Sequence, residues 1–132
     1  MAFSKPQKTI ALKVVADDAA FPAVADGVMY FTVPETMNGY KLTAVGAHVY
    51  TASDGGVAIN ISLYNLTDTV DMLDTQLTID NGEKDSSTAE VAATVDTDHD
   101  DVATADELRI DVNQCGANAV GFEFRMVFEY PA

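Results

Sequence analysis

The chain has 132 residues, 48% of them hydrophobic, and its 21 acidic against 7 basic residues give a net charge of −14. This length fits one domain with a buried core, and this composition excludes a wholly disordered chain. The negative charge would repel phosphate backbones and anionic lipid surfaces, so we expect neither nucleic acid nor membrane as a partner.

A flexible arm and three strands are expected in the first part of the chain. Residues 1–8 contain a proline, two lysines and little apolar surface, which favours an N-terminal arm with Lys5 and Lys8 as candidate partner contacts. Apolar and polar residues then alternate with a period of two, which predicts strands. The expected strands cover residues 9–16, 27–33 and 40–51. Pro34 cannot donate to a central ladder and therefore ends the second strand.

The strongest turn signal, Ser53-Asp54-Gly55-Gly56, precedes a strand predicted over residues 57–66. Alternation in this strand predicts four inward residues, which are Val57, Ile59, Ile61 and Leu63. Shorter strands are expected over residues 71–73, 76–80 and 89–95. Residues 86–93 allow at most one helical turn.

Two strongly alternating segments lie near the end of the chain. Their predicted inward residues are Leu108, Ile110 and Val112 in the first segment, and Phe122, Phe124, Met126, Phe128 and Tyr130 in the second. Residues 113–121, which contain two glycines, separate them, so the segments form either a long hairpin or neighbours across a sandwich. The number and spacing of strands predict a single all-β domain over residues 9–132, an antiparallel β-sandwich.

A cluster of carboxylates stands out between the predicted strands. Asp96, Asp98, Asp100 and Glu107 occupy the positions of four ligands in an EF-hand-type calcium loop. Asp101, however, stands where that loop needs glycine, and the flanking segments are strands rather than helices. Two interpretations follow: a calcium site, or a solvated acidic loop that leads into a strand at Glu107. We favour the acidic loop and predict no cofactor beyond this possible Ca²⁺.

Catalytic signatures are absent from the sequence. It contains no nucleophile elbow, no glycine-rich phosphate loop and no metal-binding spacing of histidine and cysteine. His48 lies within a predicted strand, and Cys115 has no neighbouring base to activate its thiol. We therefore expect a protein that is not an enzyme. The single cysteine and the lack of a signal-like N-terminus favour synthesis in a reducing cytoplasm.

The aromatic residues allow two interpretations. Carbohydrate-binding sandwiches place sugars on exposed aromatic rings. This chain has no tryptophan, and its five tyrosines are spread along the sequence. We therefore expect the tyrosines to belong to the core rather than to a sugar platform.

Two stretches together resemble a known group of proteins. One is residues 40–52, continued by residues 59–61 and 71–73; the other is residues 101–112, followed by Gly121-Phe122 and a final apolar strand. They resemble the small β-sandwich structural proteins of tailed bacteriophages, which occur as capsid decoration (cement) proteins and as fibre or tail modules. The resemblance covers roughly residues 27–130. It implies a jelly-roll-like domain that trimerises on the virion surface, and it implies no active-site residues.

The leading functional hypothesis is therefore a decoration protein that stabilises a phage head by binding to the major capsid protein and to copies of itself. Such a protein is made in the host bacterial cytoplasm and is located on the virion surface. One alternative is a tail or fibre module that binds a host-surface glycan. A further alternative is a calcium-dependent binding module unrelated to phage.

Overall fold

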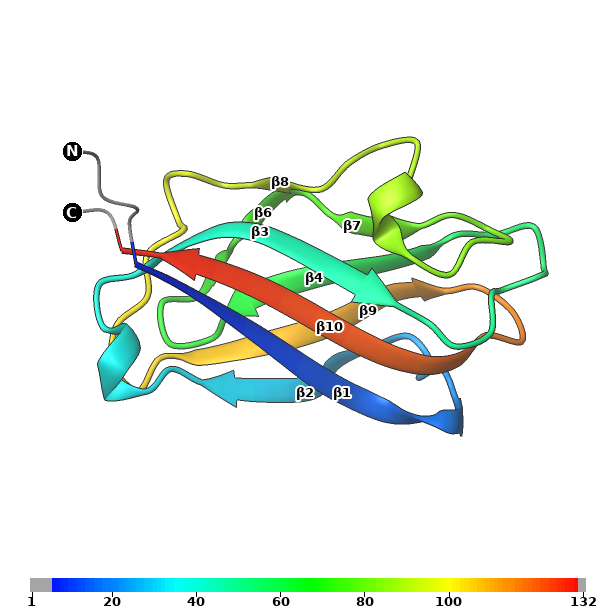
Figure 1. Cartoon of the computed structure of the whole chain (residues 1–132), viewed down its shortest axis with the longest axis horizontal. Coiled ribbons are helices and arrows are strands. Elements are labelled where there is room, and N and C mark those ends of the chain that lie inside the picture. Colours follow the sequence, from blue (N-terminus) through cyan, green and yellow to red (C-terminus); the bar gives the residue numbers. More distant parts are fainter. Residues whose placement is uncertain (1–5, 131–132) are drawn as a thin grey trace.

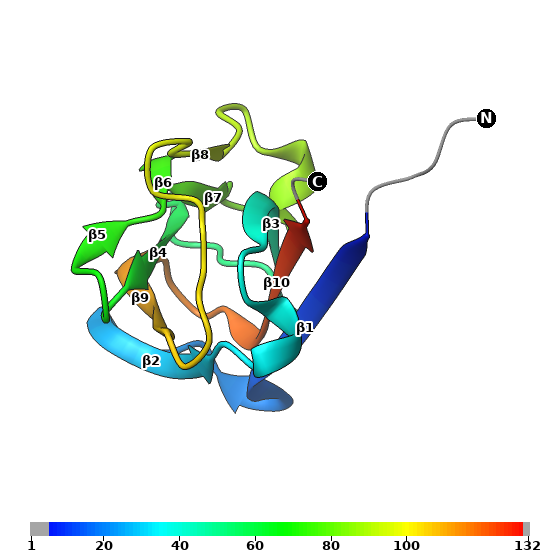
Figure 2. The ribbon, with the colours of Figure 1, turned by 90° about the vertical axis from the view of Figure 1, so that its left-hand side faces the viewer.

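The computed structural model describes residues 6–130, which form an antiparallel β-sandwich. Two sheets pack face to face (Figures 1 and 2). The first sheet has the strand order β1-β10-β3, with bounds β1 (Gln7–Ala20), β10 (Val120–Glu129) and β3 (Lys41–His48). The second has the order β2-β9-β4-β5, with bounds β2 (Ala25–Thr32), β9 (Glu107–Cys115), β4 (Ile59–Asn65) and β5 (Val70–Asp71). The predicted all-β sandwich is thus confirmed.

Shorter elements complete the fold. Strand β7 (Leu77–Ile79) also pairs with β4, and β6 (Leu73–Thr75) forms a two-stranded sheet with β8 (Thr94–Val95). Two 3-10 turns are present in the described part of the chain, η1 (Glu35–Met37) and η2 (Ser86–Thr88). The second is the single helical turn allowed by the sequence. The sequence analysis does not predict β6 as a strand of its own. Strand β8 is much shorter than the strand expected over residues 89–95.

Strands β9 and β10 are consecutive in the chain but belong to different sheets. They are therefore neighbours across the sandwich and not a hairpin. The crossing between them requires left-handed backbone at Gly116 (φ 63°) and Asn118 (φ 62°). A Cβ atom at Gly116 would lie 2.8 Å from the Cβ atom of Ser53, so this tight crossing depends on glycine.

The core fills the space between the sheets. The predicted inward residues of β10, β9 and β4 are at most 1% exposed, and they are Phe122, Phe124, Met126, Phe128, Leu108, Ile110, Val112, Ile59, Ile61 and Leu63. Two predictions of inward position were wrong. Val57 is 44% exposed and Tyr130 is 41% exposed, because Val57 precedes β4 and Tyr130 follows β10.

The N-terminal strand is longer than predicted at both ends. It begins at Gln7, opposite Glu129, so the last two residues of the expected arm over residues 1–8 are part of the sheet. It also continues past Asp17, because two irregularities in its pairing with β10 let it bend along the sheet. Lys13 and Asp17 form a salt bridge of 2.7 Å on this bent strand.

The finer expectation of a jelly roll stays a prediction. A jelly roll has eight strands in two sheets. In the described residues the first sheet contains only three strands, and the segment beyond β3 meets it through isolated bridges from Asp85 to His48 and from Asp101 to Lys41.

Candidate functional site

The acidic loop of residues 96–106 runs across one end of the sandwich, between β8 and β9 (Figure 2). Its backbone is fixed to the start of β3. Val102 accepts a hydrogen bond from the Gly39 N–H (2.8 Å) and donates one to the Tyr40 carbonyl (2.9 Å), and the Asp100 carbonyl accepts from the Leu42 N–H (2.8 Å). The side chain of Val102 is 2% exposed. The loop therefore closes one end of the core.

The first carboxylates of the candidate calcium loop make local bonds. Asp96 accepts a hydrogen bond from the Asp98 N–H (3.0 Å) and pairs with Nδ1 of His99 (2.8 Å). The hydrogen bond with His99 lowers the pKa of Asp96, and the same bond raises the pKa of His99. Asp98 itself is exposed. These bonds stabilise a turn at the start of the loop.

The remaining two candidate ligands lie in different surroundings. Asp100 is buried, whereas Glu107 begins β9 opposite Thr32 and donates its backbone N–H to the Thr67 hydroxyl. Within residues 6–130, no three side chains of histidine, cysteine, aspartate or glutamate are grouped so as to hold a metal ion. The calcium site at Asp96, Asp98, Asp100 and Glu107 stays a hypothesis, and the solvated acidic loop stays the favoured interpretation.

A buried polar contact that the sequence analysis missed fastens this loop to β4. Asp106 is 5% exposed, and its carboxylate accepts hydrogen bonds from Nδ2 of Asn65 (3.1 Å) and from the Ala103 N–H (3.0 Å). The Asn65 side-chain carbonyl in turn accepts from the Asp68 N–H (3.2 Å). The sequence does carry a signal, because Asn65 continues the inward alternation of Ile61 and Leu63 with a polar residue.

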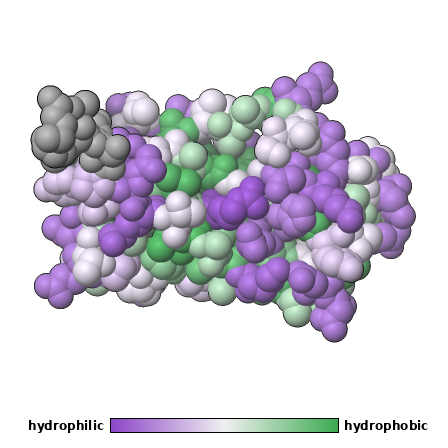
Figure 3. All heavy atoms as spheres, viewed as in Figure 1, coloured by the Kyte–Doolittle hydropathy of each residue, from purple (hydrophilic) through white to green (hydrophobic). Residues whose placement is uncertain are grey.

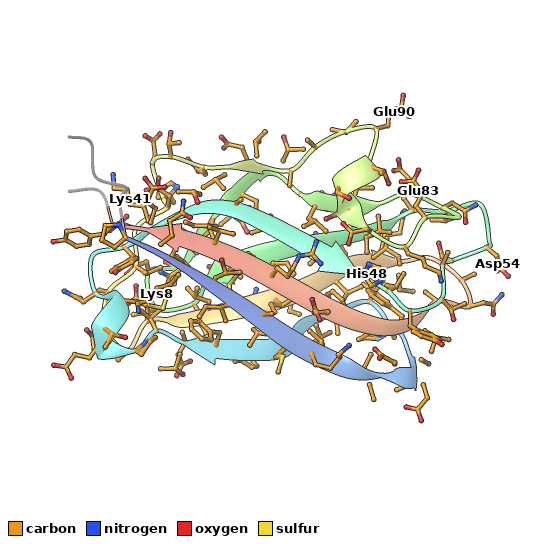
Figure 4. All side chains as sticks on the ribbon, in the orientation of Figure 1. Lys8, Lys41, His48, Asp54, Glu83 and Glu90 are labelled. Carbon is orange, nitrogen blue, oxygen red and sulfur yellow. The ribbon has the colours of Figure 1, made fainter. Side chains whose placement is uncertain are left out.

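Of the two predicted partner-binding lysines, Lys5 and Lys8, the structure describes only Lys8. Lys5 lies outside the described residues. Lys8 is half-buried in β1, opposite Phe128, and forms no ion pair within residues 6–130. Figure 4 places Lys8 and Lys41 towards one end of the sandwich, and Asp54 and Glu83 towards the other. Lys8 pairs with Phe128 and Lys41 with Glu129 near the end of β10, so charges of both signs lie there.

Asp85 connects two strands of the first sheet with η2. It pairs with Nδ1 of His48 on β3 (2.9 Å), accepts from Nη2 of Arg125 on β10 (3.3 Å to each oxygen) and accepts from the Ser87 N–H of η2 (2.9 Å). Burial alone would raise the pKa of Asp85. The hydrogen bonds from Ser87 and His48 and the charge of Arg125 outweigh burial and hold this pKa at about 2. This cluster attaches the segment that contains η2 to the sheet.

A row of four side chains crosses the outer face of the second sheet. Tyr30 on β2 pairs with Arg109 on β9, which pairs with Tyr64 on β4, which pairs with Asp71 on β5. The guanidinium of Arg109 lies 4.5 Å from the centre of the Tyr64 ring. It is held in place by two hydrogen bonds to Asp111 (2.8 and 3.0 Å). We call these four residues the tyrosine row.

The tyrosines are not buried in the core, contrary to the sequence-based expectation, although Tyr40 is partly buried and packs against it. None of the five is buried, and Tyr30 is 53% and Tyr50 61% exposed. The phenol end of Tyr30 covers Gly27, where an added Cβ would lie 2.4 Å from the tyrosine oxygen. Glycine at this position therefore allows Tyr30 to lie close to its own strand.

No protein-family model and no curated protein matches this chain. Among solved structures, the fold is similar to that of a chain in the VP2 subviral particle of infectious bursal disease virus, with a TM-score of 0.52 at 12% sequence identity. The similarity covers 94% of this chain and 33% of the viral one, so this chain spans about a third of that protein. At this identity the similarity shows the β-sandwich fold alone. Within residues 6–130, no helix has the length and apolar character needed to cross a bilayer.

Proposed function

We propose that this chain is a non-enzymatic structural protein of a virion, and specifically a decoration protein on the head of a tailed phage. One observation carries the proposal: nearly the whole chain, 94% of it, superimposes on part of a protein that forms a subviral particle. The sequence resemblance to small phage structural proteins supports the same role. The viral similarity concerns the fold, so the finer assignment to a phage head depends on the experiments below.

Strand β1 offers the surface for assembly. It lies at the edge of the first sheet, and its outer edge has no strand partner among the described residues. Figure 3 shows apolar residues on the outer face of this sheet dispersed among hydrophilic ones rather than gathered in one large patch. Ile10, Leu12 and Val14 of β1 are only partly buried against the core. An exposed edge strand requires cover, which other copies or shell subunits would provide.

Binding to the shell is the direct test of this function. We expect the purified protein to bind saturably to phage heads produced without it, and to raise their resistance to heat, because simultaneous contact with several subunits stabilises the shell. Binding measured by co-sedimentation should weaken with salt if Lys8 meets an acidic partner. Lys8→Glu should reduce binding, and Lys84→Glu, with the same charge change at an exposed site, serves as the control. If the protein does not bind to such heads but adsorbs to host cells, the result would instead favour the tail or fibre alternative.

A closed oligomer is expected in solution. We predict a trimer, with a mass by light scattering near three times the 14.1 kDa of the chain, since a threefold assembly suits the local threefold positions of an icosahedral shell. Thr9→Lys places a charge at an exposed position of the β1 edge and should yield monomers with an unchanged circular dichroism spectrum. Val91→Lys, at an apolar position that is 60% exposed in the segment between η2 and β8, should remain trimeric. A monomeric parent protein would contradict the prediction.

A further inference from the structure

We propose that the hollow beside the tyrosine row binds a neutral, hydroxyl-rich ligand, namely a sugar unit of a glycan. The hollow has a volume of about 410 Å³ and is lined by Ser62, Asp71, Leu73, Asp74, Thr75 and Gln76. These residues come from β4, β5, β6 and the connection to β7. The site is separate from the β1 edge, and the inference does not depend on the proposed virion role.

The hollow presents hydrogen-bond donors that are already oriented. Asn113 donates from Nδ2 to the side-chain oxygen of Gln76 (2.9 Å) and to the hydroxyl oxygen of Ser62 (2.5 Å). These bonds direct the Gln76 amide so that its own N–H groups remain without an acceptor among the described residues. The Ser62 hydroxyl likewise keeps its proton for donation. A ligand in the hollow would therefore meet a fixed set of donors.

Carboxylate acceptors lie in the same hollow. Asp71 and Asp74 are both exposed, and neither forms an ion pair or a side-chain hydrogen bond within residues 6–130. Each ionised carboxylate can accept several hydrogen bonds, and bonds to a charged acceptor are the stronger kind. The hollow thus combines free acceptors with free donors a few residues apart.

This combination selects among three chemical classes of ligand. An anion would be repelled by Asp71 and Asp74. A cation would pair with these carboxylates but would leave the amide N–H groups of Gln76 facing a positive charge. A sugar hydroxyl both donates and accepts, so a neutral sugar satisfies the carboxylates and the amide together.

The aromatic neighbour fits the same ligand class. Tyr64 lies two residues after Ser62 on β4, on the same face of the sheet, and pairs directly with Asp71. The contact with Arg109, itself held by Asp111, fixes the position of the Tyr64 ring. Rigid aromatic side chains next to a few placed polar groups are typical of small-ligand sites, because little conformational entropy is lost on binding.

Amide chemical shifts provide the test, since they detect weak binding. The ¹⁵N-labelled protein would be titrated with neutral monosaccharides (glucose, galactose, mannose, rhamnose and N-acetylglucosamine), and with dextran and mannan. We expect saturable shifts of Ser62, Asp71 and the side-chain amide of Gln76 with at least one of these probes. Gln76→Ala, at a half-buried position, and Asp74→Asn, at an exposed one, should each weaken binding by about tenfold, as expected for a lost hydrogen bond to a charged or oriented group. Thr43→Ala, on the exposed face of β3, is the matched control.

Several results would overturn the inference. One is the absence of shifts in the hollow with every neutral probe, and another is binding that persists in both variants. A response to a lysine-rich peptide alone would identify the hollow as a contact for basic side chains. A response to polygalacturonate alone would show that Asp71 and Asp74 do not repel anionic ligands. All of these measurements use the isolated protein, so their outcome is independent of whether the chain binds to phage heads.

Discussion

Replacing Asp106 by alanine is expected to lower the free energy of unfolding by about 3 kcal/mol, the upper range for a buried, charge-assisted hydrogen bond. The substitution removes the acceptor of the Ala103 N–H and the shorter of two hydrogen bonds from Asn65 Nδ2, which keeps Asp68 Oδ2 at 3.3 Å. Urea unfolding followed by circular dichroism measures the change as a shift in midpoint at constant slope. Asp98→Ala removes a carboxylate from the same loop at an exposed position and should change stability by less than about 0.5 kcal/mol.

A double variant separates the polar contact from simple loss of packing. Asn65→Leu alone should be strongly destabilising because it leaves Asp106 buried without its side-chain donor. Combining it with Asp106→Leu removes both polar partners, and the loss should be smaller than the sum of the two single losses. Additive losses would show that Asn65 and Asp106 act independently, contrary to the structure.

The sequence predicted the long central strands well because their side chains alternate between core and solvent. In β10, for example, Phe122, Phe124 and Phe128 are all buried as expected. Periodicity says nothing about which sheet a strand joins, so the choice between a hairpin and a sandwich crossing for β9 and β10 required the structure. Two- and three-residue strands such as β6 carry too little pattern to be separated from neighbouring turns.

The candidate sites were harder to predict than the fold. The spacing from Asp96 to Glu107 suits a calcium loop, but the position of that loop depends on long-range backbone bonds, such as Leu42 N–H to the Asp100 carbonyl, which local spacing cannot reveal. The tyrosine row is also a product of strand register. Tyr30, Arg109 and Tyr64 are far apart in sequence and become neighbours only because β2, β9 and β4 are adjacent.

Asp85→Ala is expected to destabilise the protein by about 2 kcal/mol, the size expected for losing a turn cap together with a charge-assisted hydrogen bond. Ser87, His48 and Arg125 all lose their shared acceptor, although Arg125 keeps Glu123 at 3.8 Å. Thermal or urea unfolding measures the change. Glu90→Ala, at an exposed position in the segment after η2, is the control and should have little effect.

The contribution of Asp85 should also depend on pH in a defined direction. Its pKa in the folded protein is about 2, against an ordinary value of 3.8, so its ionised form is favoured by folding. A lowered pKa of this kind adds stability that is complete above the ordinary pKa and is lost as the pH falls from about 4 to about 2. Because the side chain is 28% exposed, solvent screening reduces this contribution to about 1 kcal/mol. The stability difference between the parent protein and Asp85→Ala should therefore shrink over this range in urea titrations. A difference that stays constant down to pH of about 2 would show that the hydrogen bonds of Asp85 do not favour its ionised form.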